Sequence, residues 1–82
     1  MTKNEIADQI KNILVVQGIA KTKTEIEATS TLRTDLGLDE VQIIELVGAI
    51  DEIYGITLDA DEVEKAETVE QLAELIQRTG NV

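Results

Sequence analysis

The chain has 82 residues and a formal net charge of −10, with 17 acidic and 7 basic residues. A chain of this length builds one hydrophobic core, so we expect a single domain over residues 1–82. It has no histidine and no cysteine, which excludes histidine-based catalysis, thiolate chemistry, disulfides and a zinc site made from these residues. Phenylalanine and tryptophan are also missing, so the core must be aliphatic.

The N-terminal segment predicts a helix over residues 3–17. Thr2 and Glu5 have the spacing of a capping box, and Gly18 is a plausible stop. The apolar residues that recur at helical spacing are Ile6, Ile10, Ile13, Leu14 and Val16. Charged residues interrupt this segment, so it resembles neither a signal peptide nor a membrane span, and we expect a soluble cytoplasmic protein.

Residues 18–38 predict a long connection, because threonines are frequent and no apolar period is sustained. We expect this connection to be attached to the core through Ile19, Ile26, Leu32 and Leu36. A connection of this length in a small domain is often functional or contains a short helix.

A second helix is predicted over residues 40–54, capped by Asp39 and ended by Gly55. Its predicted inward stripe consists of Ile43, Leu46, Val47, Ile50 and Ile53. Val41 and Ile44 fall on a neighbouring face, close to Gly48.

The remaining chain predicts two further helical segments. A short extended link leads into one or two helical turns capped by Asp59 or Asp61. Thr68 and Gln71 then form a second capping-box pattern, which opens a last helix ended by Gly80. The expected fold is therefore all-α, a bundle of three main helices and one short helix with a long loop between the first two.

The acidic residues are concentrated in residues 35–76, which contain a single base, Lys65. Such a field repels nucleic acid and anionic membranes and attracts a partner with a basic patch, although a merely solvated surface explains it equally well. The carboxylates of residues 59–62 lack the spacing of a calcium loop, so we expect no metal site. Ser30 is the only serine and has no histidine to activate it, so we expect no enzyme.

The stretch "DLGLDEVQIIELVGAIDEIYGI" resembles the central motif of acyl carrier proteins, Asp-Leu-Gly-x-Asp-Ser-Leu followed by a helix rich in glutamate and aliphatic residues. Asp35, Leu36, Gly37 and Asp39 match this motif, and Val41 replaces its leucine. The resemblance extends over about residues 3–77. It implies an acyl-carrier-like bundle that shuttles thioester-bound acyl groups between enzymes of fatty acid, polyketide or related synthesis and is not itself an enzyme.

In that family the serine after the motif's second aspartate carries 4′-phosphopantetheine. Glu40 occupies this position next to Asp39, and a carboxylate could at best form an acyl phosphate that water would cleave. We therefore expect no cofactor on the chain as written, and 4′-phosphopantetheine only with a serine at residue 40. Ser30 lies ten residues too early to replace it.

Three interpretations of Glu40 stay open. As an acid in the first turn of a helix it is stabilising by roughly 0.3–1 kcal/mol at an exposed site. It could imitate the charge of a phosphorylated serine. Alternatively, the chain is a natural non-carrier homologue that acts as an acidic interaction or regulatory module.

The resemblance also implies a docking surface for enzymes with basic patches, namely acyl-transfer or synthase enzymes and the phosphopantetheinyl transferase, with the chain itself a monomer. The implied docking residues are Val41, Ile44, Glu45, Asp51, Glu52, Asp61 and Glu62. Two positions depart from the family: Gly48 replaces a larger apolar residue, and Gln42 stands where an acid is common. The aliphatic residues that form either an acyl-chain cleft or plain core are Ile43, Val47, Ile50, Ile56, Val63 and Ala66.

Overall fold

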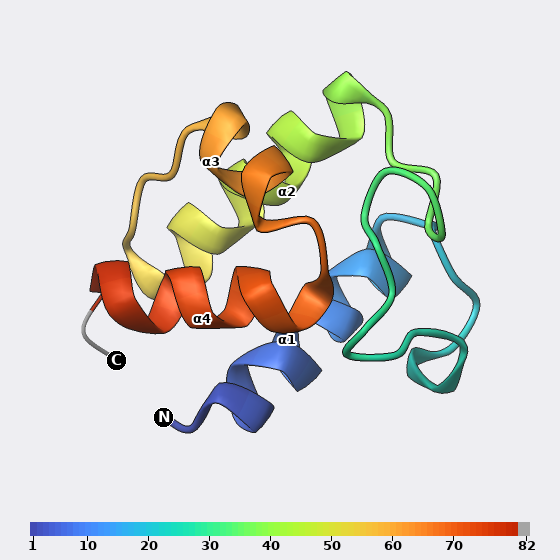
Figure 1. The fold of residues 1–82 in the computed structure, drawn as a ribbon, viewed down its shortest axis with the longest axis horizontal. Coiled ribbons are helices and arrows are strands. Elements are labelled where there is room, and N and C mark those ends of the chain that lie inside the picture. The colour runs from blue at the N-terminus through green and yellow to red at the C-terminus, as the bar shows by residue number, and fades with distance from the viewer. Residues whose placement is uncertain (81–82) are drawn as a thin grey trace.

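The computed structural model describes residues 1–80 and is all-α over that range (Figure 1). Its elements in chain order are α1 (Lys3–Val16), the 3-10 turn η1 (Lys23–Glu25), α2 (Glu40–Tyr54), α3 (Ala60–Ala66) and α4 (Val69–Gly80). Strand-type pairing in the same range is limited to an isolated bridge between Thr31 and Thr68. The predicted fold class is confirmed: three main helices, a short one, and a long loop after the first. None of the helices in residues 1–80 is both long and apolar enough to cross a membrane.

Both capping boxes expected for α1 and α4 are present. The Glu5 N–H donates to Thr2 Oγ1 at 3.2 Å, and Glu5 Oε1 accepts from the Thr2 N–H at 3.0 Å. Thr68 and Gln71 repeat the arrangement at 3.1 and 3.3 Å. Each box satisfies backbone donors that the first helical turn leaves without a partner.

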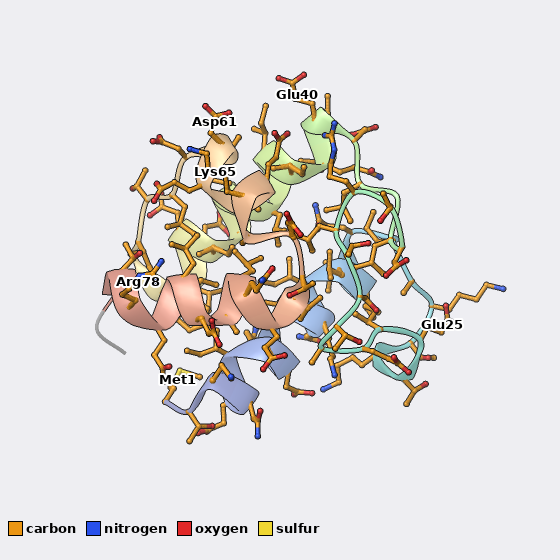
Figure 2. The ribbon with its side chains drawn as sticks, viewed as in Figure 1. Met1, Glu25, Glu40, Asp61, Lys65 and Arg78 are labelled. Carbon is orange, nitrogen blue, oxygen red and sulfur yellow. The ribbon has the colours of Figure 1, made fainter. Side chains whose placement is uncertain are left out.

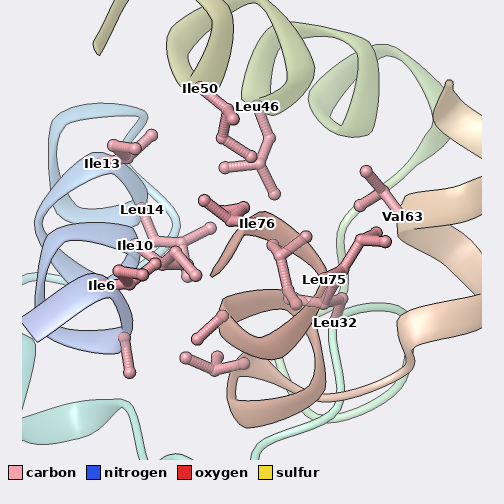
Figure 3. Packing of buried hydrophobic residues seen from close by; sticks show 14 of the residues in the cluster. Ile6, Ile10, Ile13, Leu14, Leu32, Leu46, Ile50, Val63, Leu75 and Ile76 are labelled. Carbon is pink, nitrogen blue, oxygen red and sulfur yellow. The ribbon is translucent and has the colours of Figure 1, made fainter. Parts of the chain in front are cut away.

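All four helices contribute to one aliphatic core (Figure 3). The side chains with no exposed surface are Ile6, Ile10, Leu14, Ile43, Leu46, Ile50, Val63, Val69, Leu72, Ala73 and Ile76. No polar or charged residue within residues 1–80 is buried with them. Each such large aliphatic side chain contributes about 1.5–3 kcal/mol of burial free energy, as an upper estimate. The fold therefore depends on matching aliphatic stripes rather than on buried polar contacts.

Two residues that recur at helical spacing prove to be exposed. Ile53 was placed in the inward stripe of the second helix and is 46% exposed, so that prediction is wrong. Val16, which only shares the helical spacing of the first helix, is 80% exposed. Each lies in the last turn of its helix beside a residue that does pack against the core, Val15 in α1 and Tyr54 in α2. Helical spacing defines a face of the helix, but burial also requires another element that packs against that face. At the ends of α1 and α2 the residue that packs against the core is the sequence neighbour, Val15 or Tyr54.

The long loop is attached to the core as expected. Ile26 and Leu32 are buried, and Ile19 and Leu36 are half-buried against the core. Leu38 is also buried, at 2% exposure, and was not among the expected anchors. The short helix that a loop of this length often contains is the single turn η1.

Backbone hydrogen bonds join this loop to the start of α4. The Val69 N–H donates to the Ser30 carbonyl at 3.1 Å, and the Glu70 N–H donates to the Ala28 carbonyl at 2.8 Å. The first N–H groups of a helix have no partner within it, so the loop supplies acceptors that α4 lacks.

Candidate functional site

The turn that leads into α2 is held by hydrogen bonds of Asp35 and by the backbone of Gly37, two residues of the matched motif. The Thr31 N–H donates to Asp35 Oδ2 at 3.0 Å, and the Asp35 N–H donates to Thr31 Oγ1 at 2.9 Å. Gly37 has a φ of +68°, in the left-handed region where a side chain would be strained. The Leu38 N–H then donates to the Leu32 carbonyl at 2.9 Å. These contacts set the direction from which the chain enters the helix.

Asp39 caps α2, as the sequence predicts, through a complete capping box. Asp39 Oδ1 accepts from the Gln42 N–H at 2.8 Å, and Gln42 Oε1 accepts from the Asp39 N–H at 2.9 Å. A glutamine serves as well as a glutamate at this third helical position, because either side chain supplies the accepting oxygen. Gln42 therefore keeps the geometry of the helix start although it is not an acid.

A further contact holds the start of α2 against the end of α1. Gln17 Nε2 donates to the Gln42 carbonyl at 3.1 Å. This bond connects the C-cap residue of α1 to the first turn of α2. Gln17 gave no signal in the sequence, since a single glutamine after a helix has no characteristic pattern.

Glu40 is the first residue of α2 and is exposed. Figure 2 shows its carboxylate pointing away from the protein at the outer end of the helix. The ion pairs among residues 1–80 join Lys3 with Glu70 and Glu74, Lys23 with Asp8, and Arg33 with Glu64. Within that range Glu40 has no cationic partner, and its charge faces solvent next to the positive end of the helix dipole.

The predicted docking residues on α2 and α3 are all exposed. Val41 is 64% exposed and Ile44 is 56% exposed, both large values for aliphatic side chains in a helix. The exposed acids of the set are Glu45, Asp51 and Glu52 on α2 and Asp61 and Glu62 on α3. Asp61 and Glu40 lie at the same edge of the molecule (Figure 2). None of these five acids forms an ion pair within residues 1–80.

The aliphatic side chains between α2 and α3 form part of the core. Ile43, Ile50 and Val63 have no exposed surface, and Val47 and Ala66 pack partly buried against the same cluster. An open groove of about 330 Å³ lies instead between α3 and α4. Its lining is mostly polar and consists of Glu62, Lys65, Ala66, Gln71, Glu74, Leu75 and Arg78. The described residues contain no group of acids that could hold a metal ion.

The helical bundle, the motif-fixed turn and the capped start of α2 together define a phosphopantetheine carrier domain. A family profile described as "Phosphopantetheine attachment site" matches residues 8–76. The chain is 28% identical over 82 residues to "Acyl carrier protein" of Petrotoga mobilis, covering 100% of this chain and 95% of the relative. It is 33% identical over 76 residues to "Acyl carrier protein" of Bdellovibrio bacteriovorus, covering 92% of this chain and 95% of the relative. It is 32% identical over 75 residues to the protein of the same name from Saccharopolyspora erythraea, covering 92% of this chain and 78% of the relative. The chain belongs to the acyl carrier protein family.

The residues at the attachment position do not fit the family's cofactor. Residue 40 presents a carboxylate, whereas a stable phosphodiester requires a hydroxyl. The neighbouring hydroxyls are engaged elsewhere: those of Thr31 and Thr34 are hydrogen-bonded to each other, and Ser30 Oγ accepts from the Glu27 N–H at 3.0 Å. No step through phosphopantetheine follows from this set of side chains.

Proposed function

We propose that the chain is an acyl-carrier-type docking domain that engages the partner enzymes of its family without carrying 4′-phosphopantetheine. The observation that carries this proposal is the contrast at the start of α2. The turn, the Asp39–Gln42 capping box and the exposed helix start are complete, while the hydroxyl that would bear the arm is replaced by the Glu40 carboxylate. Such a domain presents a surface to enzymes and performs no catalysis itself.

The partners are acyl-transfer or synthase enzymes and the phosphopantetheinyl transferase, each with a basic docking patch. The outer face of α2 offers carboxylates that form no ion pair within residues 1–80, beside two exposed aliphatic side chains, Val41 and Ile44. Complementary charge of this kind accelerates association and makes it dependent on salt, while apolar contacts at the centre supply affinity. With a serine at residue 40, the same domain would shuttle acyl groups of fatty acid, polyketide or related synthesis, from a cytoplasmic location and as a monomer.

The attachment chemistry is tested by intact mass after incubation with coenzyme A and a broad-specificity phosphopantetheinyl transferase. We expect no mass gain for the unaltered chain and a gain of one phosphopantetheinyl group for Glu40→Ser. The double variant Glu40→Ser, Ser30→Ala is the control and should be modified equally, since residue 30 lies in the loop. Modification of the unaltered chain, or none of Glu40→Ser, would contradict the proposal.

Docking is tested separately by competition. The unaltered chain should inhibit modification of the Glu40→Ser variant, because it presents the same surface and is not consumed. The change Glu45→Lys, Glu52→Lys in the competitor should abolish this inhibition. The change Glu25→Lys, Glu27→Lys gives the same net charge in the loop after α1, and Figure 2 shows Glu25 at the right-hand edge of the molecule, away from Glu40 and Asp61 at the top. This competitor should leave inhibition largely intact. Equal loss of inhibition in both competitors would indicate a net-charge effect without a docking surface.

A further inference from the structure

The two basic residues of the acidic half of the chain line the same groove. Residues 35–80 contain many acids but only two bases, Lys65 and Arg78. Both belong to the lining of the groove of about 330 Å³ between α3 and α4, and Figure 2 shows them on the same side of the molecule. Neither forms an ion pair within residues 1–80. The groove therefore contains two cations that no carboxylate of the described chain contacts.

The two acids in the lining of this groove have partners of their own. Glu74 Oε1 lies 3.2 Å from Lys3 Nζ, in an ion pair with the start of α1. Glu62 Oε1 accepts from the Asp59 N–H at 3.2 Å, in the capping box of α3. Each acid thus has a donor within the chain, whereas the ammonium of Lys65 and the guanidinium of Arg78 have no carboxylate acceptor within residues 1–80.

The rest of the lining indicates the size and polarity of a ligand. Gln71 uses its Oε1 in the capping box of α4, so its amide offers a ligand the Nε2 donor. Ala66 and Leu75 add apolar surface. A volume of about 330 Å³ lies at the lower end of the range for small-molecule sites. The groove therefore suits a small anion with a short apolar part.

The charge of the groove favours a phosphoryl group over a carboxylate. Guanidinium and ammonium groups both bind phosphoryl oxygens through charge-assisted hydrogen bonds. A phosphate monoester carries a charge of about −1.5 to −2 at pH 7 and neutralises both bases, whereas a single carboxylate neutralises one of them.

We propose that the groove between α3 and α4 binds a small organic phosphate monoester. Lys65 and Arg78 hold the phosphoryl group, and the carbon part lies against Ala66 and Leu75. The site depends neither on residue 40 nor on docking at the outer face of α2. A soluble ester is favoured over a phospholipid headgroup, because a chain with a net charge of −10 is repelled by an anionic membrane.

The test is an NMR titration of the full chain with phenyl phosphate at constant ionic strength. We expect shift changes at the amides of α3 and α4, centred on residues 65 and 78. Inorganic phosphate should act on the same amides but bind more weakly, because it has no apolar part. In Lys65→Gln, Arg78→Gln the affinity for phenyl phosphate should fall about fivefold to tenfold, since charged donors are lost.

Lys11→Gln, Lys21→Gln is the matched control, because it gives the same net charge by removing two bases of α1 and the loop that form no ion pair within residues 1–80. This variant should keep the affinity of the unaltered chain. Equal losses in the two double variants would indicate general charge attraction and overturn the site. Absence of shift changes in α3 and α4 would overturn it as well.

Cosedimentation with vesicles that contain phosphatidic acid distinguishes the soluble ester from a lipid headgroup. We expect no binding of the unaltered chain to these vesicles. Binding to the vesicles without binding of phenyl phosphate would overturn the assignment to a soluble ester. Lys65 and Arg78 are both exposed, so their replacement should leave the circular dichroism spectrum and the urea midpoint close to those of the unaltered chain.

Discussion

The capping box of Asp39 provides a quantitative test of how the start of α2 is held. In Asp39→Ala the helix loses the oxygen that accepts from the Gln42 N–H at 2.8 Å. The reverse bond, from the Asp39 N–H to Gln42 Oε1, uses the backbone of residue 39 and survives. The change thus removes one N-cap interaction, which is worth about 0.5–2 kcal/mol and typically about 1. For a domain of this size, each 1 kcal/mol lowers the melting temperature by about 4–8 °C.

Urea and thermal unfolding followed by far-ultraviolet circular dichroism measure this loss, since the chain has no tryptophan. Asp39→Asn is the matched control, because asparagine keeps an accepting oxygen and is an equally good N-cap. We expect Asp39→Asn to unfold close to the unaltered chain and Asp39→Ala clearly earlier. If Asp39→Ala and Asp39→Asn have the same midpoint, the side-chain cap does not stabilise α2 and the reasoning fails.

Three further predictions concern stability and titration. Leu46→Ala should lower the free energy of unfolding by about 2–5 kcal/mol because Leu46 is completely buried; Ile53→Ala, at an exposed site, should cost much less, and comparable losses in urea unfolding would refute the assigned burial. Hydrogen bonds from the backbone and hydroxyl of Thr2 hold the pKa of Glu5 below its ordinary value. The stability that the Glu5 carboxylate contributes is therefore fully present above the ordinary pKa and is lost as the pH falls through the lowered pKa. An NMR titration of the Glu5 carboxyl that shows no lowering of its pKa would contradict this. Burial raises the pKa of Tyr54. Tyrosinate absorbance, to which only this residue contributes, should therefore titrate above the ordinary pKa of about 10. The free energy of unfolding should decrease as the pH rises from the ordinary pKa to the raised one.

The helix starts were predictable from sequence because they depend on local chemistry. A capping box involves residues three apart, so Thr2 with Glu5 and Thr68 with Gln71 could be identified without knowing what surrounds them. The central motif was recognisable for the same reason. Its residues act on the turn that contains them.

Burial at helix ends and contacts across the fold were not predictable in this way. Ile53 fits the inward stripe by spacing alone, yet at the last turn of α2 the core is covered by Tyr54 instead. Leu38 and Gln17 owe their roles to residues far away in sequence, since each acts only after the loop has folded back against the helices. Two statements stay predictions because they depend on molecules outside this chain: that the α2 face docks partner enzymes, and that Glu40 cannot be modified with phosphopantetheine.

Amide hydrogen exchange at the start of α4 should reveal whether the long loop is docked. The Val69 and Glu70 amides donate to the Ser30 and Ala28 carbonyls of that loop. Both donors sit in the first turn of the helix, where exchange with solvent is normally fast because no helical acceptor is available. Here the two amides are protected only while the loop stays docked against α4. The acceptors lie about forty residues earlier in the chain, so closing this contact costs conformational entropy. Faster exchange at these two amides than in the rest of α4 would therefore record local detachment of the loop without unfolding of the helix.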